Sequence, residues 1–137
     1  MSLGGGLRVI APKDREPDVA SGSMLREAAV SERMVGAERL WLGWVELPPG
    51  LVSSVHHHGA AESGIFILSG HARFVSGEGL DRVHDADPGD FVWVPPHEVH
   101  VELNRSSNEP VRMVVARSTS EAVVVNLPTP EGWSAPV

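Results

Sequence analysis

Hydrophobic and polar positions alternate in many short runs along the chain, and no long stretch repeats at the helical period. In residues 39–47, RLWLGWVEL, bulky and β-branched side chains lead to Pro48 and Pro49, which cannot donate to a strand ladder. Further strands are predicted at residues 51–57, 64–68, 72–75, 91–94, 99–103, 111–117 and 122–126. Short strands separated by Gly, Pro, Asp and Asn at this spacing predict an all-β sandwich or barrel.

The two ends of the chain lack this pattern. Residues 1–22 contain three consecutive glycines, prolines and mixed charges, which predict an extended N-terminal arm with one strand near residues 7–10. Residues 23–35, SMLREAAVSERMV, fit a helix and a strand-like arm equally well. Residues 128–137 hold three prolines and are expected to lie on a surface or on a partner subunit. The resulting division is an arm at 1–22, a barrel at 23–127 and a tail at 128–137.

The composition limits which metal ligands and which partners the chain can have. A chain of 137 residues suits one domain, and its lack of cysteine leaves His and carboxylate side chains as the plausible metal ligands. Eighteen acidic residues against eleven basic ones give a net charge of −7, without the basic footprint of a nucleic-acid-binding protein. No run of eighteen apolar residues and no secretory signal is present. We therefore expect a cytoplasmic protein that binds small molecules and neither nucleic acid nor membranes.

Three consecutive histidines, residues 56–58, are the strongest chemical signal. Because a strand sends alternate side chains to one face, His56 and His58 point the same way and His57 points the opposite way. Converging imidazoles joined by a carboxylate are suited to a divalent metal. Taken without a partner, the same three residues also fit an exposed polar patch.

Two segments resemble the paired motifs of the cupin superfamily: residues 50–70, GLVSSVHHHGAAESGIFILSG, and residues 89–104, GDFVWVPPHEVHVELN. The matching positions are Gly50, His56, His58, Glu62 and Gly70 in the first motif, and Gly89, Pro95, His97 (in a glycine place), His100 and Asn104 in the second. The resemblance covers about residues 39–126 and implies a jelly-roll barrel, also called a double-stranded β-helix. It implies a metal held by His56, His58, Glu62 and His100. Residues 26–50, REAAVSERMVGAERLWLGWVELPPG, are similar to a group of uncharacterised single-domain cupins.

The chain departs from the family pattern at two positions. His97 replaces a glycine at a corner that suits a left-handed backbone, which His adopts at modest cost. Glu62 stands one residue before the commoner carboxylate position, which Ser63 occupies, and a one-residue slip turns a strand side chain to the other face. Either the loop at residues 59–61 absorbs this shift, or the site has three histidines and water in the remaining positions.

Glu102 is a candidate catalytic residue on the second motif. Alternation along the strand places Glu102 and Asn104 on the same face as His100. A carboxylate there can hydrogen-bond a ligand histidine, act as a general base beside bound substrate, or pair with an arginine such as Arg112. His71 and His84 lie in a hairpin region without matching partners and are expected to be solvated.

Three histidines and a carboxylate with open coordination positions suit Fe, Mn, Ni, Cu or Zn. The resemblance implies a metal-dependent enzyme, dioxygenase-like or isomerase-like, that acts on a small organic molecule. The alternative is a non-catalytic small-molecule-binding or sensing protein with a metal anchor. Open strand edges and the long N-terminal arm favour a homodimer.

Overall fold

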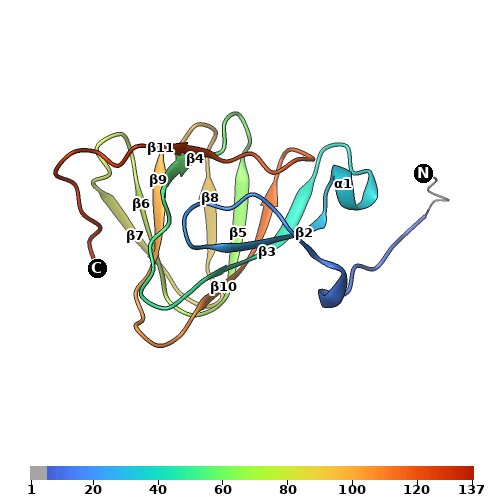
Figure 1. Ribbon diagram of the computed structural model, residues 1–137, viewed down its shortest axis with the longest axis horizontal. Helices are drawn as coiled ribbons and strands as arrows, with labels where there is room; N and C mark the ends of the chain where they lie inside the picture. The colour runs from blue at the N-terminus through green and yellow to red at the C-terminus, as the bar shows by residue number, and fades with distance from the viewer. Residues whose placement is uncertain (1–5) are drawn as a thin grey trace.

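The computed structural model describes residues 6–137, which form two packed antiparallel sheets with very little helix (Figure 1). The first sheet contains, in spatial order, β1 (Glu16–Pro17), β2 (Leu25–Val30), β3 (Trp41–Leu47), β10 (Val111–Arg117), β5 (Ser63–Ser69) and β8 (Phe91–Val94). The second contains β11 (Val125–Leu127), β4 (Val55–His57), β9 (His100–Asn104), β6 (Ala72–Ser76) and β7 (Arg82–Ala86). The arrangement is a jelly roll, which confirms the all-β prediction.

The segment that fitted a helix and a strand equally well is divided between the two. Its first part is β2, which pairs with both β1 and β3. Its second part is the single-turn helix α1 (Glu32–Val35), which begins where the Ser31 hydroxyl accepts a hydrogen bond from the Met34 amide and ends at Gly36 in a left-handed conformation. The other helical turn is the 3₁₀ helix η1 (Pro12–Asp14) in the arm.

Two local predictions are wrong. Residues 7–10 form no strand, because this part of the arm extends away from both sheets (Figure 1). The hairpin region around His84, for which no strand was predicted between residues 76 and 90, contains β7. This strand pairs antiparallel with β6, with Ser76 opposite Arg82 and Ala72 opposite Ala86. β7 was missed because its residues, RVHDA, are mostly polar and exposed.

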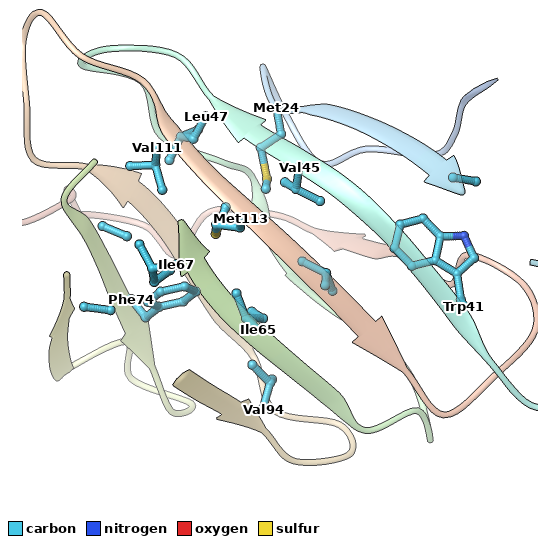
Figure 2. Close-up of a cluster of buried hydrophobic side chains, with 14 residues drawn as sticks. Met24, Trp41, Val45, Leu47, Ile65, Ile67, Phe74, Val94, Val111 and Met113 are labelled. Carbon is cyan, nitrogen blue, oxygen red and sulfur yellow. The ribbon is translucent and has the colours of Figure 1, made fainter. Parts of the chain in front are cut away.

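The main core lies between the sheets. The side chains of Val45, Ile67, Phe74 and Met113 gather between strands of both sheets, and Trp41 lies at one end of the same cluster (Figure 2). Buried positions of β3 alternate with half-buried ones, as expected for a strand with one face in the core. Gly43 leaves room for the Trp41 indole, because a Cβ at that position would collide with the ring.

A second apolar cluster covers the opposite face of the second sheet. Val101 and Leu103 of β9 pack there with side chains from the C-terminal tail, including Trp133 and Ala135. The Trp133 indole also donates a hydrogen bond to the Leu80 carbonyl at 3.1 Å. The tail therefore lies on its own chain, across the sheet that carries the histidines (Figure 1).

Within residues 6–137, none of the helices has both the length and the apolar character needed to cross a membrane.

Candidate metal centre

Strand register brings three histidines together inside the barrel. His56 of β4 is directly opposite His100 of β9, so both side chains leave the sheet on the same face. His58 is two residues beyond His56 and therefore projects to that face as well. All three residues are buried, and one ligand nitrogen from each lies within 4.8 Å of the other two. The motif spacing thus predicted the three residues that the fold gathers.

Backbone carbonyls fix the tautomer of each ring. The Nδ1 atoms of His56, His58 and His100 lie 2.7, 2.7 and 2.9 Å from the carbonyl oxygens of Ser54, Val123 and Glu98, respectively. A carbonyl only accepts hydrogen bonds, so each Nδ1 carries the proton and each neutral ring keeps its lone pair on Nε2. Three Nε2 lone pairs are thereby directed into the barrel, the form in which imidazole binds a metal.

A carboxylate faces two of these nitrogens. Glu102 is 3% exposed, and its Oε2 lies 3.3 Å from Nε2 of His56 and 3.7 Å from Nε2 of His100. Two atoms bound to one ion at about 2.1 Å lie roughly 3.0–3.5 Å apart at octahedral or tetrahedral angles. The spacing of this carboxylate and His56 therefore suits ligands that share a metal.

The protonation states favour a cation between these groups. Burial lowers the pKa of His56, although the neighbouring Glu102 opposes that shift. Burial, reinforced by the charge of Arg117, lowers the pKa of His58 to about 2. Burial alone raises the pKa of Glu102, but its interactions with His100 and His56 outweigh that effect and hold the pKa well below its ordinary value. His56 and His58 are thus held in the neutral form that binds a metal, and Glu102 is held as the carboxylate.

The residues present fit a divalent metal ion. Nε2 of His56 is buried and has no hydrogen-bond partner, which a metal bond would supply. Imidazole nitrogens and a carboxylate oxygen are ligands that suit first-row transition metals. A single divalent ion satisfies the three lone pairs and the carboxylate together, whereas protons would have to charge each buried ring separately.

Glu62 is placed away from the histidines, contrary to the expectation that it is a metal ligand. Ser63 faces the interior and is 2% exposed, so strand alternation turns Glu62 outward. The exposed Glu62 carboxylate accepts a hydrogen bond from the Trp93 indole at 2.9 Å. The loop at residues 59–61 does not absorb the one-residue shift, and Glu102 is the carboxylate that faces the cluster.

The suggested pairing of Glu102 with Arg112 is also wrong. Arg112 lies on the outward face of β10, where its Nε is 3.4 Å from Glu46. Two other arginines enter the site instead. Arg117 donates a hydrogen bond from Nη2 to Nε2 of His58 at 3.2 Å, and Arg26 is buried nearby, close enough for its charge to act on Arg117. Sequence reasoning missed both, although each occupies an inward position on its strand.

The remaining histidines have other roles. His57 accepts a hydrogen bond from the Gly59 amide at its Nδ1, outside the cluster, as its strand position predicted. His97 adopts a positive φ of 61°, so it occupies the left-handed corner in place of the family glycine. His71 is exposed beside Asp87. His84 is exposed, as expected, but its Nε2 lies 3.2 Å from the Ser76 hydroxyl, and Ser76 is paired directly with His100.

An open pocket of about 350 Å³ reaches the cluster at His100. It lies between the free edges of the two sheets, β7 and β8, and its wall is apolar at Phe74, Val92 and Val94. His84 supplies a polar group in the same wall. A volume of this size accommodates a small organic molecule. The sequence analysis did not place His84 at a pocket because its strand was not predicted.

Comparison with known protein families gives one match to this chain. Residues 43–117, more than half of the chain, match the model described as the cupin domain. No curated protein gives a significant sequence match.

Several solved structures have the same fold. The polyketide cyclase RemF from Streptomyces resistomycificus is 19% identical, with a TM-score of 0.73 over 92% of this chain and 89% of that chain. A protein from Klebsiella pneumoniae, described as uncharacterised with a double-stranded β-helix domain, is 18% identical, with a TM-score of 0.68 over 90% and 100%. Oxalate decarboxylase from Lactobacillus farciminis, in a formate complex, is 19% identical, with a TM-score of 0.72 over 84% of this chain and 34% of its own. This chain thus spans about a third of the decarboxylase, and identities this low show the fold alone.

Proposed function

The chain belongs to the cupin family, and we propose that it binds one divalent transition metal at His56, His58 and His100 and acts as an enzyme on a small organic molecule. The observation that carries this proposal is the convergence of three buried Nε2 lone pairs, each fixed by a backbone carbonyl acceptor. Two proteins of the same fold are enzymes by name, a polyketide cyclase and an oxalate decarboxylase. They are compatible with an enzymatic role for this chain and indicate neither its reaction nor its substrate.

Glu102 is the fourth ligand in this proposal, in place of Glu62. Its Oε2 faces two of the three imidazoles from inside the barrel, while Glu62 is exposed and bonded to Trp93. Fe, Mn, Ni, Cu and Zn all suit this ligand set. When bound, the metal supplies Lewis-acid polarisation of a substrate oxygen and, if it is redox active, a site for dioxygen.

The chain's own groups position the substrate. The pocket between β7 and β8 leads to His100 and presents apolar surface that excludes water on one side. His84, whose Nε2 lies 3.2 Å from the Ser76 hydroxyl, is one of the polar side chains on that wall and can hydrogen-bond a substrate there. We propose a dioxygenase-like or isomerase-like reaction on this substrate, which the turnover assay below tests.

Metal content tests this proposal at the level of single residues. Protein purified without a metal-chelating column is reconstituted with Fe(II) or Mn(II), and bound metal is measured by mass spectrometry. We expect about one metal per chain in the wild type, a loss of at least tenfold in affinity in His56→Ala and His100→Ala, and no loss in His57→Ala. Equal loss in all three variants would contradict the assignment of strand faces.

A matched pair of carboxylate variants tests the fourth ligand. Glu102→Gln is expected to weaken metal binding about tenfold or more, whereas Glu62→Gln is expected to leave it unchanged, because only Glu102 faces the histidines. Weaker metal binding in Glu62→Gln but not in Glu102→Gln would show that Glu62 is the ligand, as the cupin motif implies.

Turnover separates the enzyme from a metal-anchored binding protein. The Fe(II)-loaded chain is assayed for oxygen uptake and for isomer formation with small phenols, diketones and organic acids. Metal-dependent consumption that is lost in His100→Ala supports the enzyme. Tight binding of a compound without any conversion would favour the non-catalytic alternative.

A further inference from the structure

Two arginines are buried inside the barrel, and neither forms a salt bridge among the residues that the structure describes. Arg26 on β2 and Arg117 at the end of β10 are 2% and 3% exposed. The Nε and Nη1 atoms of both have no hydrogen-bond partner among the residues that the structure describes. Burying a guanidinium group is costly unless its N–H donors are satisfied. Four unsatisfied donors on two adjacent cations therefore indicate a place for an anion.

Arg117 touches the metal centre, and Arg26 lies beside the same Trp41 ring. Nη2 of Arg117 is 3.2 Å from Nε2 of His58, one of the proposed ligand atoms. The Trp41 ring lies beside both groups, with its centroid 5.8 Å from Cζ of Arg26 and 5.4 Å from Cζ of Arg117. Burial and the charge of Arg26 lower the pKa of Arg117 to about 9, so it remains cationic at neutral pH. Cation–π contact holds the pair without neutralising it.

The charges around the site are balanced only in the absence of a metal. Arg26 and Arg117 face Glu102, and Asp18 lies at the edge of the group, where it accepts a hydrogen bond from the Trp41 indole at 3.1 Å. These two cations and two carboxylates cancel. A divalent metal would leave two positive charges uncompensated in a buried site. A negatively charged ligand restores the balance.

We propose that Arg26 and Arg117 form an anion site next to the metal and that the natural ligand is a small organic carboxylate. The proposal rests on the metal site described above. A guanidinium group donates two parallel hydrogen bonds in a planar fork that matches a carboxylate. When His58 gives its lone pair to the metal, Nη2 of Arg117 also becomes free for this ligand.

The pocket mouth does not repel such a ligand, although it contains acidic residues. Asp85 is paired with Arg73 at 2.6 Å and lies 3.7 Å from Arg105. Glu98 lies 3.8 Å from Arg82. Asp85 and Glu98 at the entrance therefore each lie near an arginine, while Asp90, which also lines the pocket, accepts a hydrogen bond from the Asp87 amide.

Calorimetric titration of the Zn(II)-loaded full chain with malonate and with its neutral analogue malonamide tests the anion site. Malonate is expected to bind and malonamide to bind at least tenfold more weakly. Arg26→Met and Arg117→Met are each expected to weaken malonate binding tenfold or more. The control Arg112→Met, on the outward face of the same strand as Arg117, is expected to bind malonate like the wild type. Equal malonate affinity in all four proteins would overturn the proposal, as would binding of inorganic phosphate but not malonate.

Melting temperature and metal content show whether a variant loses malonate binding because it loses its fold or its metal. Replacing an unpaired buried cation with methionine is expected to leave the melting temperature of the ligand-free protein unchanged or higher, whereas a structural role for the arginines would lower it. Malonate should raise the melting temperature of the wild type and Arg112→Met only. Metal content is measured in every variant. If the arginine variants keep their metal and still bind malonate like the wild type, the anion site is wrong and the metal site stands. If the wild type binds no metal, the proposed function is wrong. Malonate binding by that metal-free wild type that is lost in the arginine variants would still support the anion site.

Discussion

Nε2 of His58 has two competing partners, and this competition is the central feature of the site at the residue scale. The Val123 carbonyl holds the proton of His58 on Nδ1, which leaves the Nε2 lone pair for either the Arg117 guanidinium or a metal. Arg117 also repels a metal cation electrostatically. Because removal of Arg117 relieves both effects, the methionine variant is expected to bind metal at least as tightly as the wild type.

The pH dependence of stability follows from the protonation state of His58. Its pKa is about 2 in the folded protein because of burial and the charge of Arg117, against an ordinary value of 6.5. Below pH 6.5 the unfolded chain therefore binds a proton that the folded chain does not, and stability falls as the pH falls. We expect the free energy of unfolding of the metal-free protein to be greatest above about pH 6.5. Below that, His58 alone lowers it by about 1.4 kcal/mol per pH unit.

Urea denaturation in the presence of EDTA, between pH 7.5 and pH 5, measures this effect. His58→Gln should remove about one proton from the pH dependence. Identical pH dependence in the wild type and His58→Gln would show that His58 is not held neutral by the fold.

The residues of the site were predictable where they depended on one strand and unpredictable where they depended on two. Alternation within a strand predicted that His56 and His58 share a face and that Glu102 follows His100. It could not say that the carboxylate at Glu102 replaces Glu62, because that depends on the register of β4 against β9 and on the path of the loop before Ser63. Arg26 and Arg117 come from distant segments, and no local pattern connects them.

At the element scale, the C-terminal tail supports the sheet that carries the metal centre. Trp133 packs over the outward face of β9, whose inward face presents His100 and Glu102. Trp133→Ala removes this cover and the hydrogen bond to the Leu80 carbonyl. Because Trp133 is half-buried, we expect a loss of about 1–3 kcal/mol of unfolding free energy, somewhat less than for a fully buried aromatic side chain.

Chemical denaturation of Trp133→Ala beside Glu131→Ala, an exposed position on the same tail, measures this contribution. Glu131→Ala should unfold at the wild-type denaturant concentration. If both variants unfold like the wild type, the tail does not stabilise the sheet.

The strands of the core were predictable because their residues are strongly apolar, as in β3 and β10. β7 was not, since its residues are polar and it is defined by pairing with β6 rather than by its own composition. Its absence from the sequence prediction also concealed the pocket, which has β7 as one wall. The short helix α1 was ambiguous because a single capped turn is too brief for a periodic pattern.

At the scale of the whole molecule, the two sheets differ in what covers their outer faces. The tail covers the second sheet, but the first presents exposed aromatic side chains on β8, with Phe91 79% and Trp93 66% exposed. Phe66 on β5 lies against Phe91, with ring centroids 4.8 Å apart. An apolar sheet face of this kind is typical of an interface between subunits. The N-terminal arm pairs with β2 of its own chain through β1. We therefore propose that the expected homodimer forms through this face rather than by arm exchange.

Size-exclusion chromatography with light scattering tests the dimer. The wild type should have about twice the chain mass of 14.7 kDa. Phe91→Lys should shift the protein toward the monomer, because it places a charge in the apolar face. Val83→Lys, at an exposed position of β7 on the other sheet, should remain dimeric. A monomeric wild type would contradict the proposed interface.

The central claim is that a metal lies where the Nε2 atoms of His56, His58 and His100 meet Oε2 of Glu102. Anomalous diffraction from crystals of the Zn(II)-loaded protein, collected on both sides of the metal absorption edge, tests it most directly. The account predicts one strong peak per chain, about 2.0–2.2 Å from each of these four atoms, with Glu62 turned outward. Absence of a peak among these residues, or a peak bound through Glu62 instead of Glu102, would contradict it.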